Sequence, residues 1–263
     1  MSIDLNQALE YAVAWAKEVG KIQLSYFRGN DLGIQTKSNV YDVVTRADKE
    51  SEAFLLDKIQ KHYPGHAVFG EESGAHAGTA EYRWVIDPLD GTTNFIHDNA
   101  PYCVSIALRS KKELLLGVVY EICRNECFWT YKGAPSYLNG NEIHVSAISN
   151  LDDSFIALGF PYATEEYKPM ANHLVNTLYG NVAGLRLMGA AAVELCYIAA
   201  GRFEARIEAF IGPWDIAAGT IILQNAGGMI TDFKGGDSYS SGSQVLASNG
   251  RIHRDLLNII DNL

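Results

Sequence analysis

Two aspartates at the end of an apolar run form the most chemically suggestive stretch of the chain. Residues 84–87 read Trp-Val-Ile-Asp, and Pro88 is expected to stop the strand there. Asp87 and Asp90 would then share one tight turn, close enough to hold a hard cation. The Gly-Thr-Thr that follows could present N–H groups and hydroxyls to an anion. Because two neighbouring carboxylates repel each other in a partly buried site, magnesium is the simplest partner.

Ordinary turn chemistry explains the same stretch equally well when it is taken alone. Asp87 could cap the turn, and Asp90-Gly91 is a common turn pair. Two other acidic motifs do not fit the spacing. Aspartyl-phosphate phosphatases need an aspartate where Pro88 stands, and an EF-hand loop begun at Asp87 would have Leu89 as a ligand and no glycine at its sixth position.

Composition indicates a globular protein with a full core. The 263 residues are 48% hydrophobic and 20% charged, enough for one large domain or two lobes. The formal charge is −10 without a long basic run, so neither nucleic acid nor an anionic membrane is an expected partner. The N-terminal residues do not resemble a signal peptide, and no apolar run reaches the roughly 18 residues of a spanning helix.

The four cysteines favour a cytoplasmic location. They match no zinc pattern, and reduced thiols are favoured over a disulfide between Cys123 and Cys127, which flank an expected hairpin tip. The other two are Cys103 and Cys196.

The segments before the central stretch supply further polar candidates. Apolar periodicity predicts a packing helix over residues 4–27. Residues 33–42 read as a loop, with Lys37 solvated unless an anion is near. Thr45 and Asp48 resemble an acidic capping box for the next helix, which would explain both without any function. A helix start aimed at a metal cluster would hold a carboxylate there as well, so the two interpretations are compatible.

Two adjacent acids follow a short strand predicted at residues 67–69. Such acids are usually solvated surface, but Glu71 precedes Asp87 by only 16 positions, and residues 74–81 look like a loop. Glu71 could therefore fold back to the central site. Glu72 would then point away from Glu71.

The chain changes character near residue 148. Before it, strand-like runs predict an antiparallel meander and a further hairpin near Asn139-Gly140. After it, helices and strands alternate, which predicts a lobe of residues 1–147 and an α/β lobe of residues 148–263. The meander strands are expected at residues 102–109, 114–122 and 126–131, and the later elements at 155–160, 170–179, 184–188, 190–200, 204–210, 216–225, 229–231, 244–248 and 254–260.

Two features of the second lobe could belong to a site. Gly189 and three alanines open a predicted helix where backbone could approach a ligand closely, although alanines also simply favour helices. Asp215 is placed as the N-cap of the helix over 216–225, and alone it indicates only that.

Four motifs occur in order along the chain: Asp42-x-x-Thr45-x-x-Asp48, Gly70-Glu71-Glu72-Ser73, residues 84–95 and Pro213-Trp214-Asp215-Ile216-Ala217-Ala218-Gly219. Together they resemble the motifs of the inositol monophosphatase family, in the superfamily that includes fructose-1,6-bisphosphatases and bisphosphate nucleotidases. The resemblance covers nearly the whole chain and implies an α+β fold, a layered αβαβα sandwich, usually dimeric, with magnesium between its lobes.

The resemblance also implies roles for single residues. Glu71, Asp87 and the Leu89 carbonyl match ligands of a first Mg²⁺, and Asp87, Asp90 and Asp215 those of a second, with Glu71 and waters serving a weaker third. Asp48 and Thr92 match the pair that orients and deprotonates the attacking water, and Lys37 a lysine near metal and phosphate. The substrate-lining segments match Leu89, Asp90, Gly91, Thr92, Gly189, Ala190 and Ala191, and Glu208 matches the acceptor of a substrate hydroxyl. Family members often carry Ser or Thr where this chain has Ala190, so one substrate hydrogen bond is missing from the pattern.

These implications predict a Mg²⁺-dependent phosphate monoesterase of the inositol-1-phosphatase type, with in-line attack by metal-activated water and inhibition by lithium. Hydrolysis of phosphate monoesters is very slow without catalysis, and two metals about 4 Å apart can activate water and stabilise both oxygens of the displacement. The motifs contain no Ser, Cys or His constellation for a phosphoenzyme. Glu208 would repel a second phosphate, which favours a small phosphorylated polyol or sugar.

Other functions remain open at this point. Arg202 and Arg206, close to Glu208 in sequence, would suit a 3′(2′),5′-bisphosphate nucleotidase. Fructose-1,6-bisphosphatase and histidinol-phosphatase activities are further alternatives. From a different class, the chain could be a non-catalytic binding protein that kept the fold.

Overall fold

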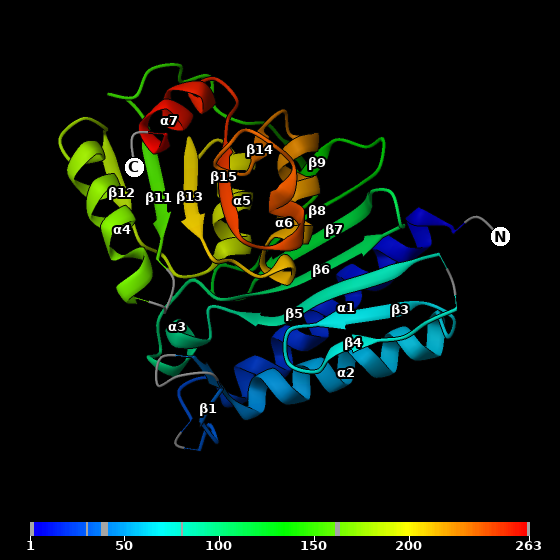
Figure 1. Cartoon of the computed structure of the whole chain (residues 1–263). Coiled ribbons are helices and arrows are strands. Elements are labelled where there is room, and N and C mark those ends of the chain that lie inside the picture. The colour runs from blue at the N-terminus through cyan, green and yellow to red at the C-terminus, as the bar shows by residue number, and fades with distance from the viewer. Residues whose placement is uncertain (1–2, 30, 38–41, 80, 161–163, 262–263) are drawn as a thin grey trace.

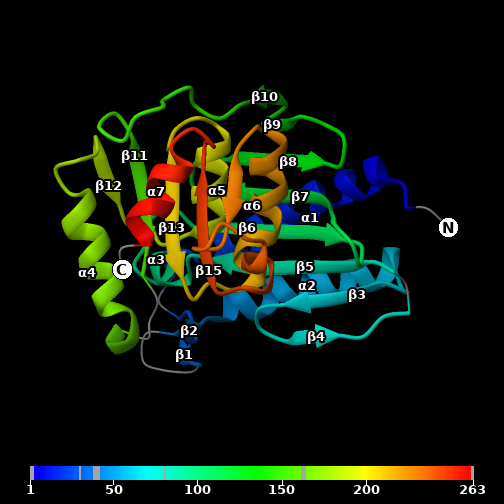
Figure 2. The ribbon, with the colours of Figure 1, turned by 45° about the horizontal axis from the view of Figure 1, so that its top comes forward.

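The computed structural model describes residues 3–29, 31–37, 42–79, 81–160 and 164–261 (Figure 1). Its helices and sheets stack in five layers, seen from two directions in Figure 1 and Figure 2. One pair of helices covers an eight-stranded sheet, a second pair fills the space between the sheets, and a third pair lies on the far side of a five-stranded sheet. The pairs are α1 (Leu5–Tyr26) with α2 (Arg46–His62), α5 (Ala191–Ala199) with α6 (Pro213–Asn225), and α4 (Thr164–Leu178) with α7 (His253–Ile260). The α+β class and the layered αβαβα sandwich are therefore confirmed.

The eight-stranded sheet has the order β10-β9-β8-β7-β6-β5-β3-β4. Its neighbours pair antiparallel except β3 and β5, so the predicted meander and hairpin are confirmed. Strand β4 lies where a loop was predicted, as an edge strand on β3. The strands are β3 (Ala67–Gly70), β4 (Gly74–His76), β5 (Arg83–Asp90), β6 (Cys103–Arg109), β7 (Leu114–Glu121), β8 (Glu126–Tyr131), β9 (Ser136–Leu138) and β10 (Asn141–Ile143).

The five-stranded sheet has the order β12-β11-β13-β15-β14. Strands β12, β11 and β13 are parallel, and β15 pairs antiparallel with β13 and β14. Its strands are β11 (Phe155–Gly159), β12 (Gly184–Arg186), β13 (Ala205–Ala209), β14 (Met229–Thr231) and β15 (Gln244–Ser248), with a 3₁₀ turn η1 (Ser238–Ser241). The elements lie close to the predicted ranges, although α4 begins at Thr164, earlier than residue 170. It tolerates Pro169 near its start, where the missing N–H removes a single helix bond.

Three smaller elements complete the fold. Strand β1 (Gln35–Thr36) lies inside the predicted loop 33–42 and pairs antiparallel with β2 (Val43–Val44) just after it, while residues 38–41 of that loop lie outside the described residues. The short helix α3 (Thr92–Ile96) follows β5. The two sheets draw on residues 67–143 and 155–248, and the lobe boundary at 147/148 stays a prediction. In the described part of the chain, no helix is both long and apolar enough to cross a bilayer. The four cysteines are free, and only Cys123 is exposed.

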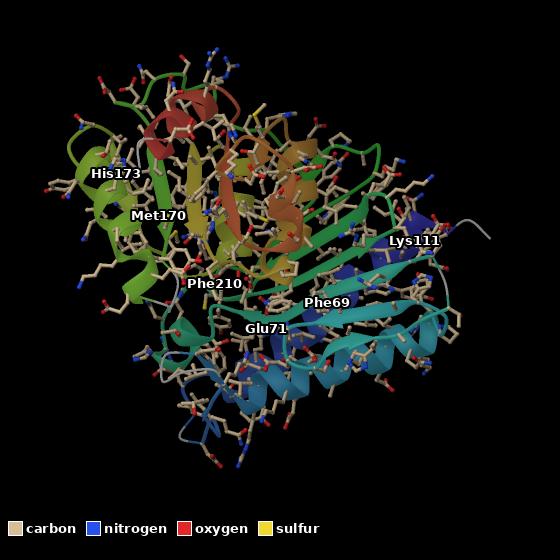
Figure 3. All side chains as sticks on the ribbon, viewed as in Figure 1. Phe69, Glu71, Lys111, Met170, His173 and Phe210 are labelled. Carbon is tan, nitrogen blue, oxygen red and sulfur yellow. The ribbon has the colours of Figure 1, made fainter. Side chains whose placement is uncertain are left out.

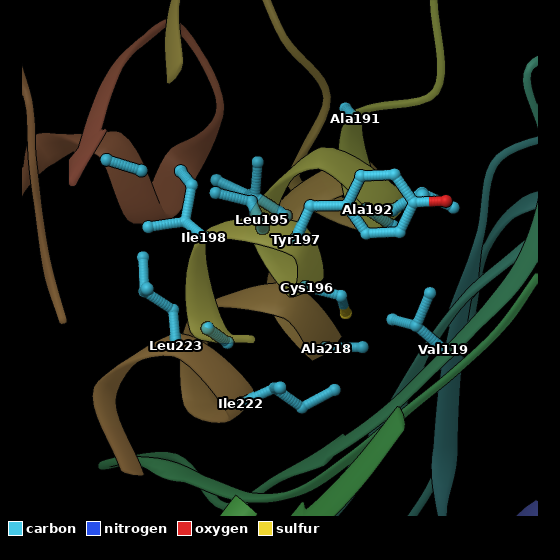
Figure 4. Close-up of a cluster of buried hydrophobic side chains, with 14 of the residues drawn as sticks. Val119, Ala191, Ala192, Leu195, Cys196, Tyr197, Ile198, Ala218, Ile222 and Leu223 are labelled. Carbon is cyan, nitrogen blue, oxygen red and sulfur yellow. The ribbon is translucent and has the colours of Figure 1, made fainter. Parts of the chain in front are cut away.

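Helices α5 and α6 form the centre of the molecule. Every residue of α5 is buried, and all of them except Glu194 and the hydroxyl of Tyr197 are apolar, as expected for a helix in the centre of a protein. Figure 4 shows its Leu195, Cys196 and Ile198 beside Ile222 and Leu223 of α6. This core touches both sheets, so the faces that carry polar site residues are held at a fixed separation.

Replacing Gly117 by Ala should lower the free energy of unfolding by about 2 kcal/mol, because overpacking a dense core forces backbone shifts. A Cβ at Gly117 of β7 would lie 2.5 Å from the carbonyl oxygen of Ala218 in α6. Urea unfolding followed by tryptophan fluorescence measures the loss. Gly20→Ala is the control, since the atoms nearest to its Cβ belong to the Tyr120 and Ile122 side chains and not to backbone, and alanine favours the helix. Equal losses in both variants would contradict the packing argument.

Candidate active site

The central stretch forms a bulge within β5. The prediction that Pro88 stops the strand is wrong, because β5 continues to Asp90. Its register against β6 shifts between Asp87, opposite Ser105, and Asp90, opposite Cys103. A bulge leaves one residue out of the ladder, so the missing N–H of proline costs no strand pairing there. The Pro88 carbonyl accepts a 2.6 Å hydrogen bond from Gln23 of α1.

Three aspartates converge between the two sheets. Asp87, Asp90 and Asp215 each offer a carboxylate oxygen within 4.8 Å of the others. Asp215 comes from the start of α6, but the prediction that it is the N-cap is wrong. Gly212 is the N-cap and Pro213 takes the first helical position, which needs no N–H, so Asp215 falls on the third. From there its Oδ2 accepts a hydrogen bond of 2.7 Å from the Gly212 N–H.

Burial makes these carboxylates reluctant to ionise together. Burial raises the pKa of Asp87 well above its ordinary value, and the charges of Glu71, Asp90 and Asp215 raise it further. Burial likewise raises the pKa of Asp215, and it raises the pKa of Asp90 to about 6. Oδ2 of Asp87 is buried with no hydrogen-bond partner among the described residues. The cluster therefore lacks positive charge at its centre, and a cation would supply it.

The N-terminus of α5 holds Asp90 in place. The N–H groups of Ala191 and Ala192 donate to its two oxygens, at 3.1 and 2.7 Å. The sequence predicted that this backbone could approach a ligand; in the structure its N–H groups contact the Asp90 carboxylate. Ala190 is fully buried, and its methyl group lies 3.3 Å from where a Cβ on Gly91 would be. Gly91 has φ 94°, a left-handed conformation that glycine adopts without strain.

Asp48 serves the helix and the site at once. The predicted capping box is present: Oδ2 of Asp48 accepts from the Thr45 N–H at 2.8 Å and from its hydroxyl at 2.5 Å. Its other oxygen, Oδ1, lies 3.0 Å from the Thr92 hydroxyl, which is also 3.0 Å from the Leu89 carbonyl. Burial raises the pKa of Asp48 despite these hydrogen bonds. The structural and functional interpretations thus apply to different oxygens of one carboxylate.

Lys37 bridges the two adjacent glutamates. Its Nζ lies 2.8 Å from Glu71 Oε1 and 2.5 Å from Glu72 Oε1, so the prediction that Glu72 points away is wrong. The carboxylate of Glu52 accepts the N–H groups of Glu72 and Ser73 and shapes the turn that brings both acids to Lys37. Burial lowers the pKa of Lys37, but the two carboxylates outweigh it and raise the net value. Burial and the Glu71 charge raise the pKa of Glu72 to about 7.

These groups surround one cavity of about 630 Å³. Of the residues predicted for the site, Asp48 and Ala190 lie fully buried outside the cavity lining. The others line the cavity: Lys37, Glu71, Asp87, Leu89, Asp90, Gly91, Thr92, Gly189, Ala191, Glu208 and Asp215.

Arg206, which the sequence analysis placed near Glu208 only as a cation for a bisphosphate nucleotidase, lines the cavity. It lies two positions before Glu208 on β13 and forms ion pairs with Glu208 and with Glu194 of α5. Glu194 in turn accepts the Met188 N–H at 3.1 Å, next to Gly189. Burial lowers the pKa of Arg206 to about 10, against the charges of Asp90 and Asp215. The two-residue period of a strand could have paired Arg206 with Glu208 in advance.

Arg202 does not join this cluster. Its guanidinium binds both oxygens of Glu126 at 2.7 and 2.8 Å and lies over the rings of Tyr197 and Phe128. The expectation that two arginines lie near Glu208 is thus met by Arg206 alone.

The layered αβαβα sandwich with a cluster of carboxylates between its sheets defines the class of fold, and sequence comparison identifies the family. The model of the Inositol monophosphatase family matches residues 4–262, so the chain belongs to this family. Nus factor SuhB of Pasteurella multocida (strain Pm70) is 40% identical over 258 residues, covering 97% of this chain and 96% of that protein.

Solved structures agree with the family assignment. The inositol monophosphatase from Anabaena (Nostoc) sp. PCC 7120 is 34% identical, with a TM-score of 0.89 over 99% of this chain and 98% of its own. The extragenic suppressor protein suhB from Bartonella henselae is 30% identical, with a TM-score of 0.93 over 97% and 98%. Similar proteins therefore carry two kinds of name, a phosphatase and a Nus factor.

In metal-free protein, the melting temperature should fall as the pH rises from about 4 to about 7. The folded pKa values of Asp87, Asp90 and Asp215 lie above the ordinary 3.8, so the folded state binds more protons in this range. Their stabilising contribution is therefore present at low pH and is lost as the pH rises through the folded pKa values, about 6 for Asp90. Asp87→Asn should flatten this dependence and raise the melting temperature at pH 7.

Thermal unfolding in chelator between pH 4.5 and 7.5 measures the effect. Asp152→Asn, at an exposed position, is the control and should follow the unmodified protein. A melting temperature of Asp87→Asn below that of the control at pH 7 would contradict the repulsion argument.

Proposed function

We propose that this protein is a Mg²⁺-dependent phosphate monoester hydrolase of the inositol monophosphatase type. The observation that carries the proposal is the convergence of Asp87, Asp90 and Asp215 within 4.8 Å, although they come from β5 and α6. Glu71 adds a fourth carboxylate whose charge acts on Asp87. The likeness to the inositol monophosphatase from Anabaena supports the substrate class.

The donor set fits magnesium. The cluster consists of carboxylate oxygens, the ligands that Mg²⁺ prefers, and the buried Oδ2 of Asp87 has no partner in the described part of the chain. Asp87, Asp90 and Asp215 would hold one ion, and Glu71, Asp87 and the Leu89 carbonyl another, with Glu71 serving a weaker third. Bound ions would neutralise phosphoryl charge and lower the pKa of the attacking water.

Thr92 and Asp48 are placed to handle the proton of that water. The Thr92 hydroxyl has a single proton, which it can donate to Oδ1 of Asp48 while its own oxygen accepts from a water in the cavity. Asp48 has no exposed surface, so a proton that reaches it through Thr92 would be shielded from solvent. This arrangement orients the water and gives its proton a destination.

Glu208 favours a hydroxyl-bearing substrate. Its Oε2 pairs with Arg206, which leaves Oε1 to accept a hydrogen bond in the cavity. The Arg206 charge is shared with Glu194, so this wall does not offer the free cations that a second phosphate would need. A polyol monophosphate such as inositol 1-phosphate fits better than a bisphosphate nucleotide. Lithium inhibition, a homodimer and a cytoplasmic location belong to the same proposal.

Purified protein should release phosphate from inositol 1-phosphate at millimolar Mg²⁺, and Li⁺ should inhibit it. Asp90→Asn should lower kcat/KM by about 100-fold or more, because it removes the charge of a metal ligand. Even substitutions of residues that only hydrogen-bond to metal ligands lower activity by up to about 100-fold. Asp152→Asn is the matched surface control. No turnover at any Mg²⁺ concentration would refute the proposal, and an unchanged rate in Asp90→Asn would refute the metal assignment.

A second candidate function is that of a Nus factor. It is favoured by relatives of that name, such as the 40% identical SuhB of Pasteurella multocida. The two candidates are compatible if the Nus factor role uses a surface away from the carboxylates. The expectation of no nucleic-acid partner applies to the phosphatase candidate alone.

Expression of this chain in a Pasteurella strain that lacks SuhB separates the two candidates. If the second candidate holds, the chain should restore the wild-type phenotype to that strain, and the Asp90→Asn variant should restore it equally well. Failure of both forms, at expression levels confirmed by immunoblot, would remove the second candidate. Restoration by the unmodified chain alone would tie that role to hydrolysis.

A further inference from the structure

Two apolar residues of the cavity lining have no part in the proposed reaction. Leu187 and Phe210 line the cavity, and these residues are 65% and 66% exposed. Single exposed apolar residues need no explanation, but these two open into the same cavity as the carboxylates. The large exposed apolar residues outside the cavity in the described chain are Leu24, Ile34, Val175, Tyr179 and Met229.

Phe210 has a backbone conformation that is unfavourable for a bulky residue. Phe210 has φ 61°, the left-handed region that bulky residues rarely adopt. It follows the last residue of β13, where the chain turns toward α6, and a glycine would make this turn without strain. Residues in such conformations concentrate at functional sites.

Two contacts hold this conformation. The Phe210 N–H donates to the Ser243 carbonyl, and its ring centroid lies 6.0 Å from that of Tyr167 on α4. In Figure 3 Phe210 lies at the end of β13, between the elements that carry Glu71 and Met170. The ring therefore has one aromatic neighbour, and about two thirds of the residue stays accessible.

We propose that Leu187 and Phe210 bind an apolar ring on the alcohol half of the substrate. The ligand class is a phosphate monoester whose alcohol carries an aromatic ring several bonds from the ester oxygen. The carboxylates would take the phosphate with Mg²⁺, and the ring would stack on Phe210 with Leu187 as a second contact in the same cavity. This inference rests on the proposed phosphatase function and adds a second class of alcohol to the polyol esters proposed above.

Binding of non-hydrolysable phosphonates tests the inference without requiring turnover. With Mg²⁺ present, calorimetry should give a Kd for 3-phenylpropylphosphonate about tenfold below that for propylphosphonate, because the two differ only by the ring. Phosphate release from 3-phenylpropyl phosphate, propyl phosphate and inositol 1-phosphate is measured in parallel. Equal Kd values for the two phosphonates overturn the inference, whereas failure to hydrolyse any of the esters counts against the phosphatase function instead.

Variants at Phe210 assign the preference to its ring. Phe210→Ala and Phe210→Gly should both bring the two phosphonates to equal affinity. Phe210→Gly should also raise the melting temperature above that of Phe210→Ala, because glycine relieves the left-handed strain. Leu24→Ala, at an exposed leucine outside the cavity, should retain the ring preference. Ring preference that survives both Phe210 variants, or equal loss of activity on all esters, overturns the assignment.

Discussion

Mutual repulsion among buried carboxylates is the interaction on which the rest of this structure depends. Asp87, Asp90 and Asp215 lie too close together to ionise freely in a site that water does not screen. The fold offsets this cost by giving each of them a backbone N–H donor. Leu89 donates to Asp87, Ala191 and Ala192 to Asp90, and Gly212 to Asp215. One oxygen of Asp87 nevertheless remains without a partner in the described chain, and a cation could supply that partner.

The layers explain how so few elements can hold this cluster. Helices α5 and α6 lie between the sheets, and their N-termini supply Ala191 and Asp215. The bulge in β5 aims Asp87 and Asp90 at those N-termini from the first sheet. A shift of either helix would therefore separate carboxylates from the N–H groups that hold them. Tight packing at Gly117 against α6 makes such a shift difficult.

Local patterns predicted the elements better than they predicted their contacts. The capping box of Thr45 and Asp48, the antiparallel meander and the alternating second half depend on neighbours in sequence, and all are present. The errors at Pro88 and Glu72 have a different origin. Pro88 stays within β5 because it sits at a bulge, and Glu72 turns inward because Glu52 and Lys37 reach it from distant segments. Such contacts leave no local signal in the chain, which is why the roles of single site residues depended on resemblance to a family.

The carboxylates and the exposed apolar residues of the cavity lie on different kinds of backbone, and this difference determines which of them can be substituted independently. Asp87, Asp90 and Asp215 lie within a central strand and the first turn of a helix, fixed by backbone donors. Leu187 and Phe210 lie just beyond the ends of β12 and β13, where the chain leaves the sheet. Substitution there changes a surface of the cavity without moving the carboxylates. For the proposed phosphatase, this geometry would separate the chemistry of phosphate release from the choice of alcohol.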